Sequence, residues 1–143
     1  QGQAYRLPIA DLKAVLTENR EVQRLLARYT HALAVQQAYT ALSNAVHHID
    51  ERVARWILMC HDRVDGSDIN LTHEFMSIML AVRRPSVTTA LHVLEGKKLI
   101  YSERGVVSVR NRAGLEAFAR DAYGECEKEY ERLIGAVVSR AAS

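Results

Sequence analysis

Two adjacent arginines, a proline and a run of small polar residues form the segment of this sequence best suited to contact with a charged surface. Arg83 and Arg84 each carry a planar guanidinium, which can pair with a phosphate or with the O6 and N7 atoms of guanine. Short hydroxyl and imidazole side chains follow Pro85, namely Ser86, Thr88, Thr89 and His92. Such groups bind phosphates or base edges, and a threonine methyl can contact thymine. The segment therefore predicts an interface for nucleic acid.

The residues around this segment are expected to form two short helices joined by a tight turn. Thr72 is the expected N-cap of the first, because its hydroxyl can accept a free backbone N–H. Apolar side chains at spacings of three and four then give this helix one apolar face: Phe75, Met76, Met79 and Leu80. A break at residues 81–84 precedes Pro85, which suits the first turn of a helix, where its missing N–H costs nothing.

The second helix is expected to have an apolar back and a polar front. Val87, Leu91 and Leu94 point to one side of it. The opposite side carries Pro85, Thr88, Thr89 and His92. Two short helices of this kind describe a helix-turn-helix, and we expect its recognition helix near residues 84–95.

A small β-hairpin is expected directly after the recognition helix. Residues 99–102 and 106–109 flank a glycine-containing turn at residues 103–105. A hairpin at this place is a wing, and Arg104 at its tip can reach a phosphate. The start of the first helix is expected to touch the nucleic-acid backbone through Thr72 and His73.

The charge of the sequence is unevenly distributed. Between Arg83 and Arg112 there are seven basic and two acidic residues, a local net charge of +5. From Ala113 onward, six acidic residues outnumber four basic ones. One part of the chain is therefore suited to a polyanion, although the whole chain carries a net charge of only +2.

The composition limits the class of protein. With 143 residues and 48% hydrophobic content, the chain can form one or two small domains with a real core. Its two cysteines do not make a disulfide framework, which favours a reducing cytoplasm. No apolar run approaches the roughly 20 residues of a membrane span, and no signal-peptide pattern is present. Because the chain begins with Gln rather than Met, we expect a fragment or a processed product with a domain preceding it.

The first half of the chain is expected to be mainly helical. Residues 1–7 are expected to be the last strand of a preceding domain, and Pro8 opens a short helix. The core-facing side chains of this helix are expected to be Ile9, Leu12 and Leu16. Asn19 is the expected cap of a long helix that runs to about His47 without proline or glycine.

The long helix has more apolar residues than packing on a single side would require. A narrow stripe of coiled-coil type recurs at alternating spacings of three and four: Val35, Ala38, Leu42, Ala45 and Ile49. A helix with two apolar faces usually has two partners, and the small residues of the stripe allow a second helix to approach closely. We therefore expect a homodimer formed along this stripe. The alternative is a helix buried on several sides of a monomer.

Further helices are expected after the long one. Asp50 can cap a helix over residues 51–64, whose buried side carries Val53, Trp56, Ile57 and Cys60. Residues 65–68 form a turn by composition. Asn111 caps a helix that Gly124 is expected to end, and residues 125–143 have a helical pattern.

Metal binding and catalysis are not favoured by any motif. The cysteine and histidine groups that raise the question are Cys60-His61-Asp62, His47-His48 and Cys126. None has the paired spacing of a structural zinc site, and Cys60 lies on the expected buried face of its helix. Adjacent residues of a helix point about 100° apart, which argues against a Cys-His catalytic pair. We expect no metal, no cofactor bound by this chain and no enzymatic activity.

The sequence resembles the DNA-binding domain of Crp/Fnr-family bacterial transcriptional regulators. The resemblance is strongest over VARWILMCHDR, LTHEFMSIMLAVRRPSVTTALHVLEGKKLI, the hairpin and NRAGLEAFA. The preceding AYRLPIADLKAVL and the long helix resemble the end of the family's effector-binding domain and its dimerisation helix. The resemblance implies a mainly α fold with two parts. Residues 1–49 are a remnant of a cyclic-nucleotide-binding-like effector domain plus the dimerisation helix. Residues 50–143 are a winged helix-turn-helix domain with a C-terminal helical extension.

The resemblance also implies partners and contacts. The protein would act as a homodimer on double-stranded DNA, with each subunit placing residues 84–94 in a major groove. Arg84 matches the family's base- or phosphate-contacting arginine. The exposed loop at residues 61–70 matches the surface that such regulators offer to RNA polymerase. Any effector would be bound by an N-terminal domain outside this chain, and its identity is unknown.

Two departures from the family pattern limit what can be carried over. Where cyclic-AMP-responsive members have a Thr-Ser pair on the long helix, this chain has Gln36-Gln37-Ala38-Tyr39, which does not match. Where many members have a glutamate after the arginine, this chain has Pro85, and Thr89 stands where some relatives have arginine. Neither cyclic AMP nor the well-known family operator is therefore predicted.

Two other functions stay open at this stage. One is a self-contained winged-helix repressor of MarR type, which has a similar length and flanking helices. The other is a winged helix used only to bind proteins. Salt-dependent binding to duplex DNA distinguishes the second alternative from DNA-binding proteins.

Overall fold

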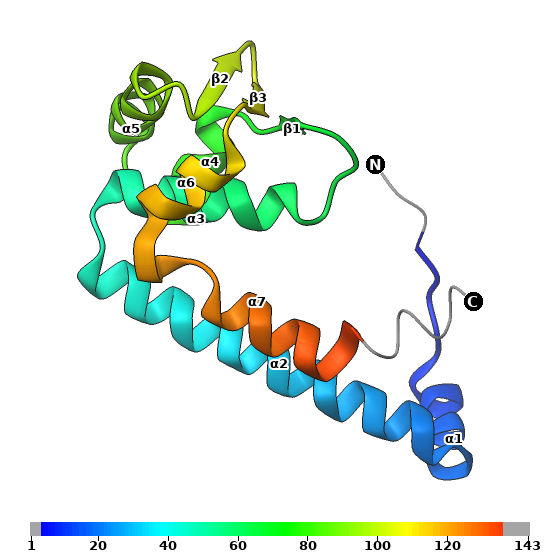
Figure 1. The fold of residues 1–143 in the computed structure, drawn as a ribbon. Helices are drawn as coiled ribbons and strands as arrows, with labels where there is room; N and C mark the ends of the chain where they lie inside the picture. The colour runs from blue at the N-terminus through cyan, green and yellow to red at the C-terminus, as the bar shows by residue number, and fades with distance from the viewer. Residues whose placement is uncertain (1–3, 136–143) are drawn as a thin grey trace. The chain divides into compact units, whose positions relative to one another are not determined.

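The computed structural model describes residues 4–135, which form two compact units (Figure 1). Within this range, one unit contains residues 4–37 and 126–135, and the other contains Ala38–Glu125. The C-terminal helical residues therefore belong to the same unit as the first helices. Among the described residues, no helix is long and apolar enough to cross a membrane.

The first unit begins with α1 (Ile9–Glu18) and the start of α2 (Arg20–Val46). The predicted cap at Asn19 is confirmed, since its side-chain oxygen accepts the backbone N–H groups of Glu21 and Val22 at 3.0 and 3.1 Å. The expectation for the face of α1 is partly wrong. Leu12 and Leu16 are half-buried, but Ile9 is 72% exposed.

The structure tests the expected N-terminal strand and the expected C-terminal helix only in part. Residues 4–7 do not form a strand, and residues 1–3 of the expected strand lie outside the described part of the chain. The predicted helical C-terminal segment is observed as α7 (Glu125–Tyr130) and a π-helical turn, η2 (Glu131–Gly135). Its remaining residues, 136–143, are outside the description.

The sequence predicted either one long helix or two with a slight bend, and the structure has one helix, α2, with 27 residues. Ala32 and Ser43 are buried on one of its sides. The small stripe residues Ala38 and Ala45 are exposed, about 120° around the helix from Ala32. Leu42, on the same stripe, is 52% exposed.

The expected stripe ends earlier than predicted. Its first member, Val35, is half-buried, and α2 stops at Val46. Ile49 is the first residue of the next helix, α3 (Ile49–His61), and packs against the core of the second unit. Including Ile49 in the stripe was therefore wrong, because the backbone leaves the helix at residues 47–48.

The second unit is a helical domain with a small sheet. After α3 come β1 (Asp68–Asn70), α4 (His73–Leu80), α5 (Arg84–Gly96), β2 (Ile100–Glu103), β3 (Val106–Val109), α6 (Arg112–Ala119) and a 3₁₀ turn, η1 (Arg120–Ala122). The sheet is antiparallel with the order β1-β3-β2. This arrangement confirms the predicted mainly α fold with a hairpin after the second helix of the motif.

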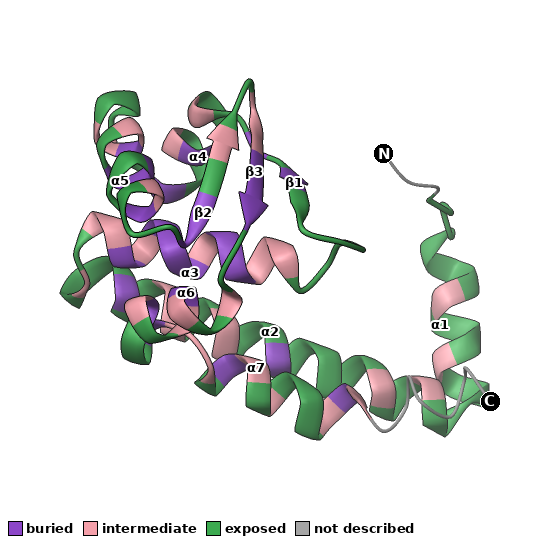
Figure 2. Cartoon of the chain, turned by 45° about the horizontal axis from the view of Figure 1, so that its top comes forward, coloured by how far each residue is buried: buried purple, intermediate pink, exposed green. Residues whose placement is uncertain are grey.

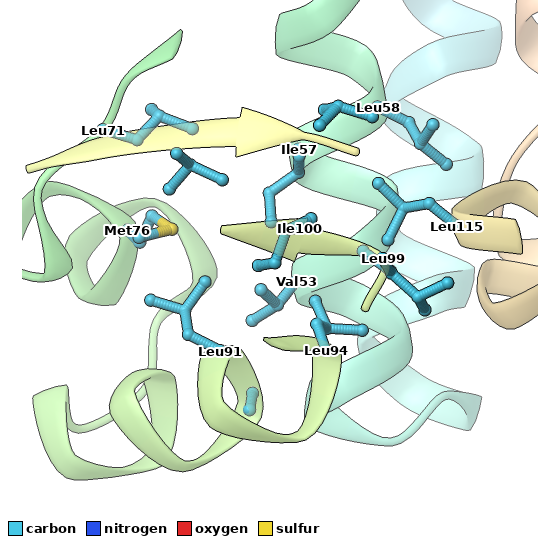
Figure 3. Close-up of a cluster of buried hydrophobic side chains, with 14 of the residues drawn as sticks. Val53, Ile57, Leu58, Leu71, Met76, Leu91, Leu94, Leu99, Ile100 and Leu115 are labelled. Carbon is cyan, nitrogen blue, oxygen red and sulfur yellow. The ribbon is translucent and has the colours of Figure 1, made fainter. Parts of the chain in front are cut away.

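One hydrophobic core holds this domain together (Figure 3). Apolar side chains from α3, α4, α5, β2 and α6 converge on it, including Ile57, Met76, Leu91 and Leu115, each fully buried. Truncation of such a residue to alanine typically costs about 2–5 kcal/mol of stability. The core therefore fixes how the helices and the hairpin are placed relative to one another.

Several local expectations need correction. Helix α3 begins after His48 and not after Asp50, because the Glu51 side chain accepts the His48 N–H at 3.0 Å. The same helix ends at His61 and not near residue 64. Asp68, expected in a turn, begins strand β1, which the sequence did not predict. Helix α6 ends at Ala119, well before Gly124, although its cap at Asn111 is confirmed.

Candidate nucleic-acid interface

Helices α4 and α5 are joined by a tight turn at residues 81–83. Thr72 is the N-cap of α4, as predicted, and its hydroxyl oxygen accepts the Phe75 N–H at 3.1 Å. Ala81 ends α4 in the left-handed conformation, with φ 52°. The guanidinium of Arg52, on α3, donates to the carbonyl oxygen of Leu80. This contact ties the turn to the core helix of the domain.

The expected apolar face of α4 is only half buried. Met76 and Leu80 are in the core, but Phe75 and Met79 are 47% and 50% exposed. Phe75 packs edge-on against Trp56, with ring centroids 5.8 Å apart. The buried side of the helix therefore consists of a single pair at a spacing of four.

Helix α5 has the predicted back and front (Figure 2). Pro85 is in its first turn, and Val87, Leu91 and Leu94 are fully buried. The polar front is divided by burial: Arg84, Pro85, Thr89 and His92 are exposed, whereas Ser86 and Thr88 are half-buried. Arg83, the residue just before the helix, is also exposed.

The two threonines of α5 use their hydroxyl protons within the helix. Thr88 donates to the carbonyl oxygen of Arg84 at 3.2 Å, and Thr89 donates to that of Pro85 at 3.1 Å. What remains for a partner at Thr89 is an oxygen lone pair and a methyl group. These suit an amino donor in the major groove or the methyl group of thymine.

The wing lies against the start of α4. Its turn contains two residues rather than the three expected, Arg104 and Gly105, with φ 49° and 82°. The Leu71 N–H donates to the Gly105 carbonyl oxygen at 2.8 Å. A Cβ on Gly105 would lie 3.3 Å from Thr72 Cγ2, so glycine suits both the turn and this close approach. The Arg104 side chain is 92% exposed.

A groove of about 600 Å³ lies where α4, α5 and the wing meet. It is lined by Thr72, His73, Glu74, Arg84, Arg104 and Gly105. Four of these are predicted contact residues, which are far apart in the sequence and are brought together by the fold. The other predicted residues, Arg83, Ser86, Thr88, Thr89 and His92, do not line it. His73 is linked to α5 through a 3.0 Å contact between its Nδ1 and the Thr88 Oγ1.

Some residues that shape this interface were not predicted from the sequence. Glu74 and Gly105 line the groove. The signal for Gly105 in the sequence was a glycine in a hairpin turn, a position that favours the positive φ seen here. Arg52 had no signal, because its contact with Leu80 joins residues 28 positions apart.

The basic segment is not one continuous cationic surface. Arg112 forms ion pairs with Asp62 at 2.7 Å and with Glu116 at 2.8 Å, and it also donates to the Tyr123 hydroxyl. Its charge is therefore neutralised within the domain. Arg84 and Arg104 line the groove, and Arg104 forms an exposed ion pair with Glu103 at 3.8 Å.

Nucleophilic or metal-binding chemistry is not supported in the described part of the chain. Burial raises the pKa of the Cys60 thiol to about 11, which keeps it protonated at neutral pH. Among residues 4–135, no group of three or more His, Cys, Asp or Glu side chains could hold a metal ion.

Two helices joined by a tight turn, a hairpin wing and an exposed polar helix front define a winged helix-turn-helix, a class of domain that binds DNA. Residues 51–118 match the family of the Crp-like helix-turn-helix domain. That stretch is therefore a Crp-like helix-turn-helix domain.

Solved structures of other proteins share this fold. TTHB099, a transcriptional regulator of the CRP family from Thermus thermophilus, is 25% identical, with a TM-score of 0.54. The match covers 66% of this chain and 49% of that chain. FixK2 from Bradyrhizobium japonicum has a TM-score of 0.70 at 20% identity, with 78% of this chain and 58% of that chain covered.

A CooA variant from Carboxydothermus hydrogenoformans shares the fold as well, with a TM-score of 0.67 at 12% identity. That match covers 78% of this chain and 55% of the other. The chain thus spans about half the length of the solved proteins that it matches. The comparison with curated proteins gave no match.

Proposed function

We propose that the protein acts as a homodimer that binds specific DNA sequences and thereby regulates transcription. The observation that carries the proposal is the exposed front of α5, which stands beside a groove lined by arginines from α5 and the wing. Such a helix can enter a major groove while the wing and the start of α4 contact the backbone on either side.

The side chains have different roles in this proposal. Arg84 contacts a guanine or a phosphate, and Thr89 and His92 contact base edges, because these three are exposed on α5. Backbone phosphates are contacted by the remaining polar residues of the interface: Thr72, His73, Arg83, Ser86 and Arg104. Thr88 is half-buried and supports the contacts through its bond with His73.

The dimer is proposed to form along α2. Ala38, Leu42 and Ala45 are exposed on one side of this helix, away from the side that carries the buried Ala32 and Ser43. An exposed stripe of leucine and alanine is more favourable when it is covered by a second copy. Two copies related by a two-fold axis would recognise half-sites about 34 Å apart, one turn of DNA.

Other partners follow from the same proposal. The matches to two solved relatives cover only 49% and 58% of the lengths of those proteins. We propose that any effector is bound by a domain outside it, while this chain itself binds no cofactor. The segment 61–70, of which residues 62–68 are exposed, is proposed as a contact for RNA polymerase. A protein with these partners works in the cytoplasm and is not an enzyme.

Selection of duplexes from a random DNA pool tests the proposal. We expect an enriched, two-fold symmetric sequence with half-sites about one helical turn apart, and binding that weakens steeply with salt. The absence of enrichment, together with salt-independent binding, would leave only a protein-binding role for the winged helix. A MarR-type repressor is not favoured, because the domain matches the Crp-like family.

A further inference from the structure

We propose that His73 is a proton-dependent contact to a DNA backbone phosphate held in the groove between α4, α5 and the wing tip; this proposal rests on the DNA-binding function proposed above. His73 is half-buried at the start of α4 and lines the groove with Arg84 and Arg104. The two arginines are fixed in charge, whereas the imidazole can change its charge near neutral pH.

The hydrogen bonds of Thr88 determine which nitrogen of the neutral imidazole carries the proton. The single hydroxyl proton of Thr88 is donated to the carbonyl oxygen of Arg84 at 3.2 Å. The 3.0 Å contact between Thr88 Oγ1 and His73 Nδ1 is therefore one in which Nδ1–H donates to the hydroxyl oxygen. Neutral His73 consequently keeps a bare lone pair at Nε2. In this form the ring cannot donate to a phosphate.

Protonation changes what the second ring nitrogen can do. A proton on Nε2 turns it from an acceptor into a donor and adds a positive charge, while the Nδ1–H bond to Thr88 is kept. The charged groups that line the same groove are Arg84 from α5, Arg104 from the wing, which also pairs with Glu103 at 3.8 Å, and Glu74 from α4. The arginines oppose protonation and the glutamate favours it. A bound phosphate adds negative charge and acceptor oxygens, so it favours the protonated ring.

DNA binding is therefore expected to take up a proton at His73. Because the bound state favours the protonated ring, this contribution to affinity is present below the pH range in which a histidine changes its charge. It is lost as the pH rises above that range. The chain would then bind DNA more tightly under mildly acidic conditions.

The test measures affinity for a duplex containing the selected sequence, by fluorescence anisotropy at constant ionic strength. Wild type is compared with His73→Gln, which cannot titrate, and His73→Arg, which keeps its charge. Between about pH 6 and pH 8, the dissociation constant of wild type is expected to rise roughly five- to tenfold more than that of His73→Gln. His73→Arg is expected to keep the low-pH affinity at pH 8, with a salt slope steeper by about one per subunit.

A matched control and three outcomes make the test decisive. His48→Gln removes a histidine outside the groove and should keep the wild-type pH profile. Circular dichroism verifies that each variant is folded. Identical pH profiles for wild type and His73→Gln would overturn the role of His73 but not the DNA-binding function. The role of His73 would also be overturned if His48→Gln reduced the pH dependence of DNA affinity as much as His73→Gln does. A wild type that binds no duplex at any pH would overturn the proposed function itself.

Discussion

The arginines of the domain differ in what surrounds them, and this difference decides what each can do. Arg112 is held by Asp62 and Glu116 and acts as an internal tie. Arg84 and Arg104 line a groove that also contains a single carboxylate, from Glu74. The local net charge of the sequence does not distinguish these arginines, because it contains no information on the partner of each charge. Only the folded arrangement separates the arginines that line the groove from Arg112, which is held by ion pairs within the domain.

Arg84→Ala is predicted to weaken binding to the selected DNA by about 1–3 kcal/mol and to relax the preference at one base pair. The reason is the loss of a two-pronged guanidinium contact from the exposed start of α5. Affinities for single-base variants of the site provide the measurement. An equal loss on all sequences would reassign Arg84 to the DNA backbone.

Cys60 is predicted to react slowly with iodoacetamide in the native protein at pH 8. Its pKa is raised to about 11 by burial, and thiolate forms only as the pH approaches that value. Mass spectrometry of a Cys126→Ser variant follows this thiol alone. The same variant in denaturant should be labelled quickly, and equally fast labelling of the folded protein would contradict the burial of Cys60.

Among the elements, those with strong local signals could be predicted from the sequence. The caps at Asn19, Thr72 and Asn111 all accept backbone N–H groups as expected, because capping depends on a side chain and its immediate neighbours. The back of α5 was also predictable from its periodicity.

Elements that depend on distant partners were missed or misplaced. Strand β1 has only three residues and exists because it pairs with β3, nearly 40 positions later in the chain. Ile49 continues the apolar spacing of α2, but the helix stops at Val46 and the side chain enters the domain core. In the candidate site, the individual residues were predicted while the groove that joins them was not, since it results from packing of α4, α5 and the wing.

Ala81→Gly is predicted to increase the free energy of unfolding by about 0.5–1 kcal/mol. Ala81 ends α4 with φ 52°, a conformation that costs about 1–2 kcal/mol for a residue with a Cβ and little for glycine. Urea denaturation monitored by circular dichroism measures the change. The control is Ala117→Gly in the middle of α6, where φ is helical and the same substitution should destabilise by about 0.5–1 kcal/mol. Destabilisation by both variants would refute the strain at Ala81.

For the whole molecule, the proposed dimer depends on the stripe on α2. Ala38, Leu42 and Ala45 remain exposed in one copy, so the chain presents an apolar surface that its own described residues do not cover. The proposed two-fold symmetric DNA site depends on this surface, because two recognition helices must be held at a fixed spacing.

Leu42→Glu is predicted to convert the dimer to a monomer and to weaken DNA binding. A carboxylate within a helix pair would be buried without a partner, which is strongly unfavourable. Light scattering after size-exclusion chromatography gives the mass of each species. Asn44→Glu places the same charge on an exposed position of another side of α2 and should leave the dimer intact. A dimer that survives Leu42→Glu would remove the stripe as the interface.

The orientation of the domain on DNA can be observed directly by backbone NMR of the protein titrated with the selected duplex. We predict that the largest shift changes fall on Arg84–His92, on residues 72–74 and on the wing tip at Arg104 and Gly105. Amides of α6 around Glu116, on the side held by Arg112, should change little. Changes concentrated on α6, with the front of α5 unaffected, would contradict the claim that this front binds DNA.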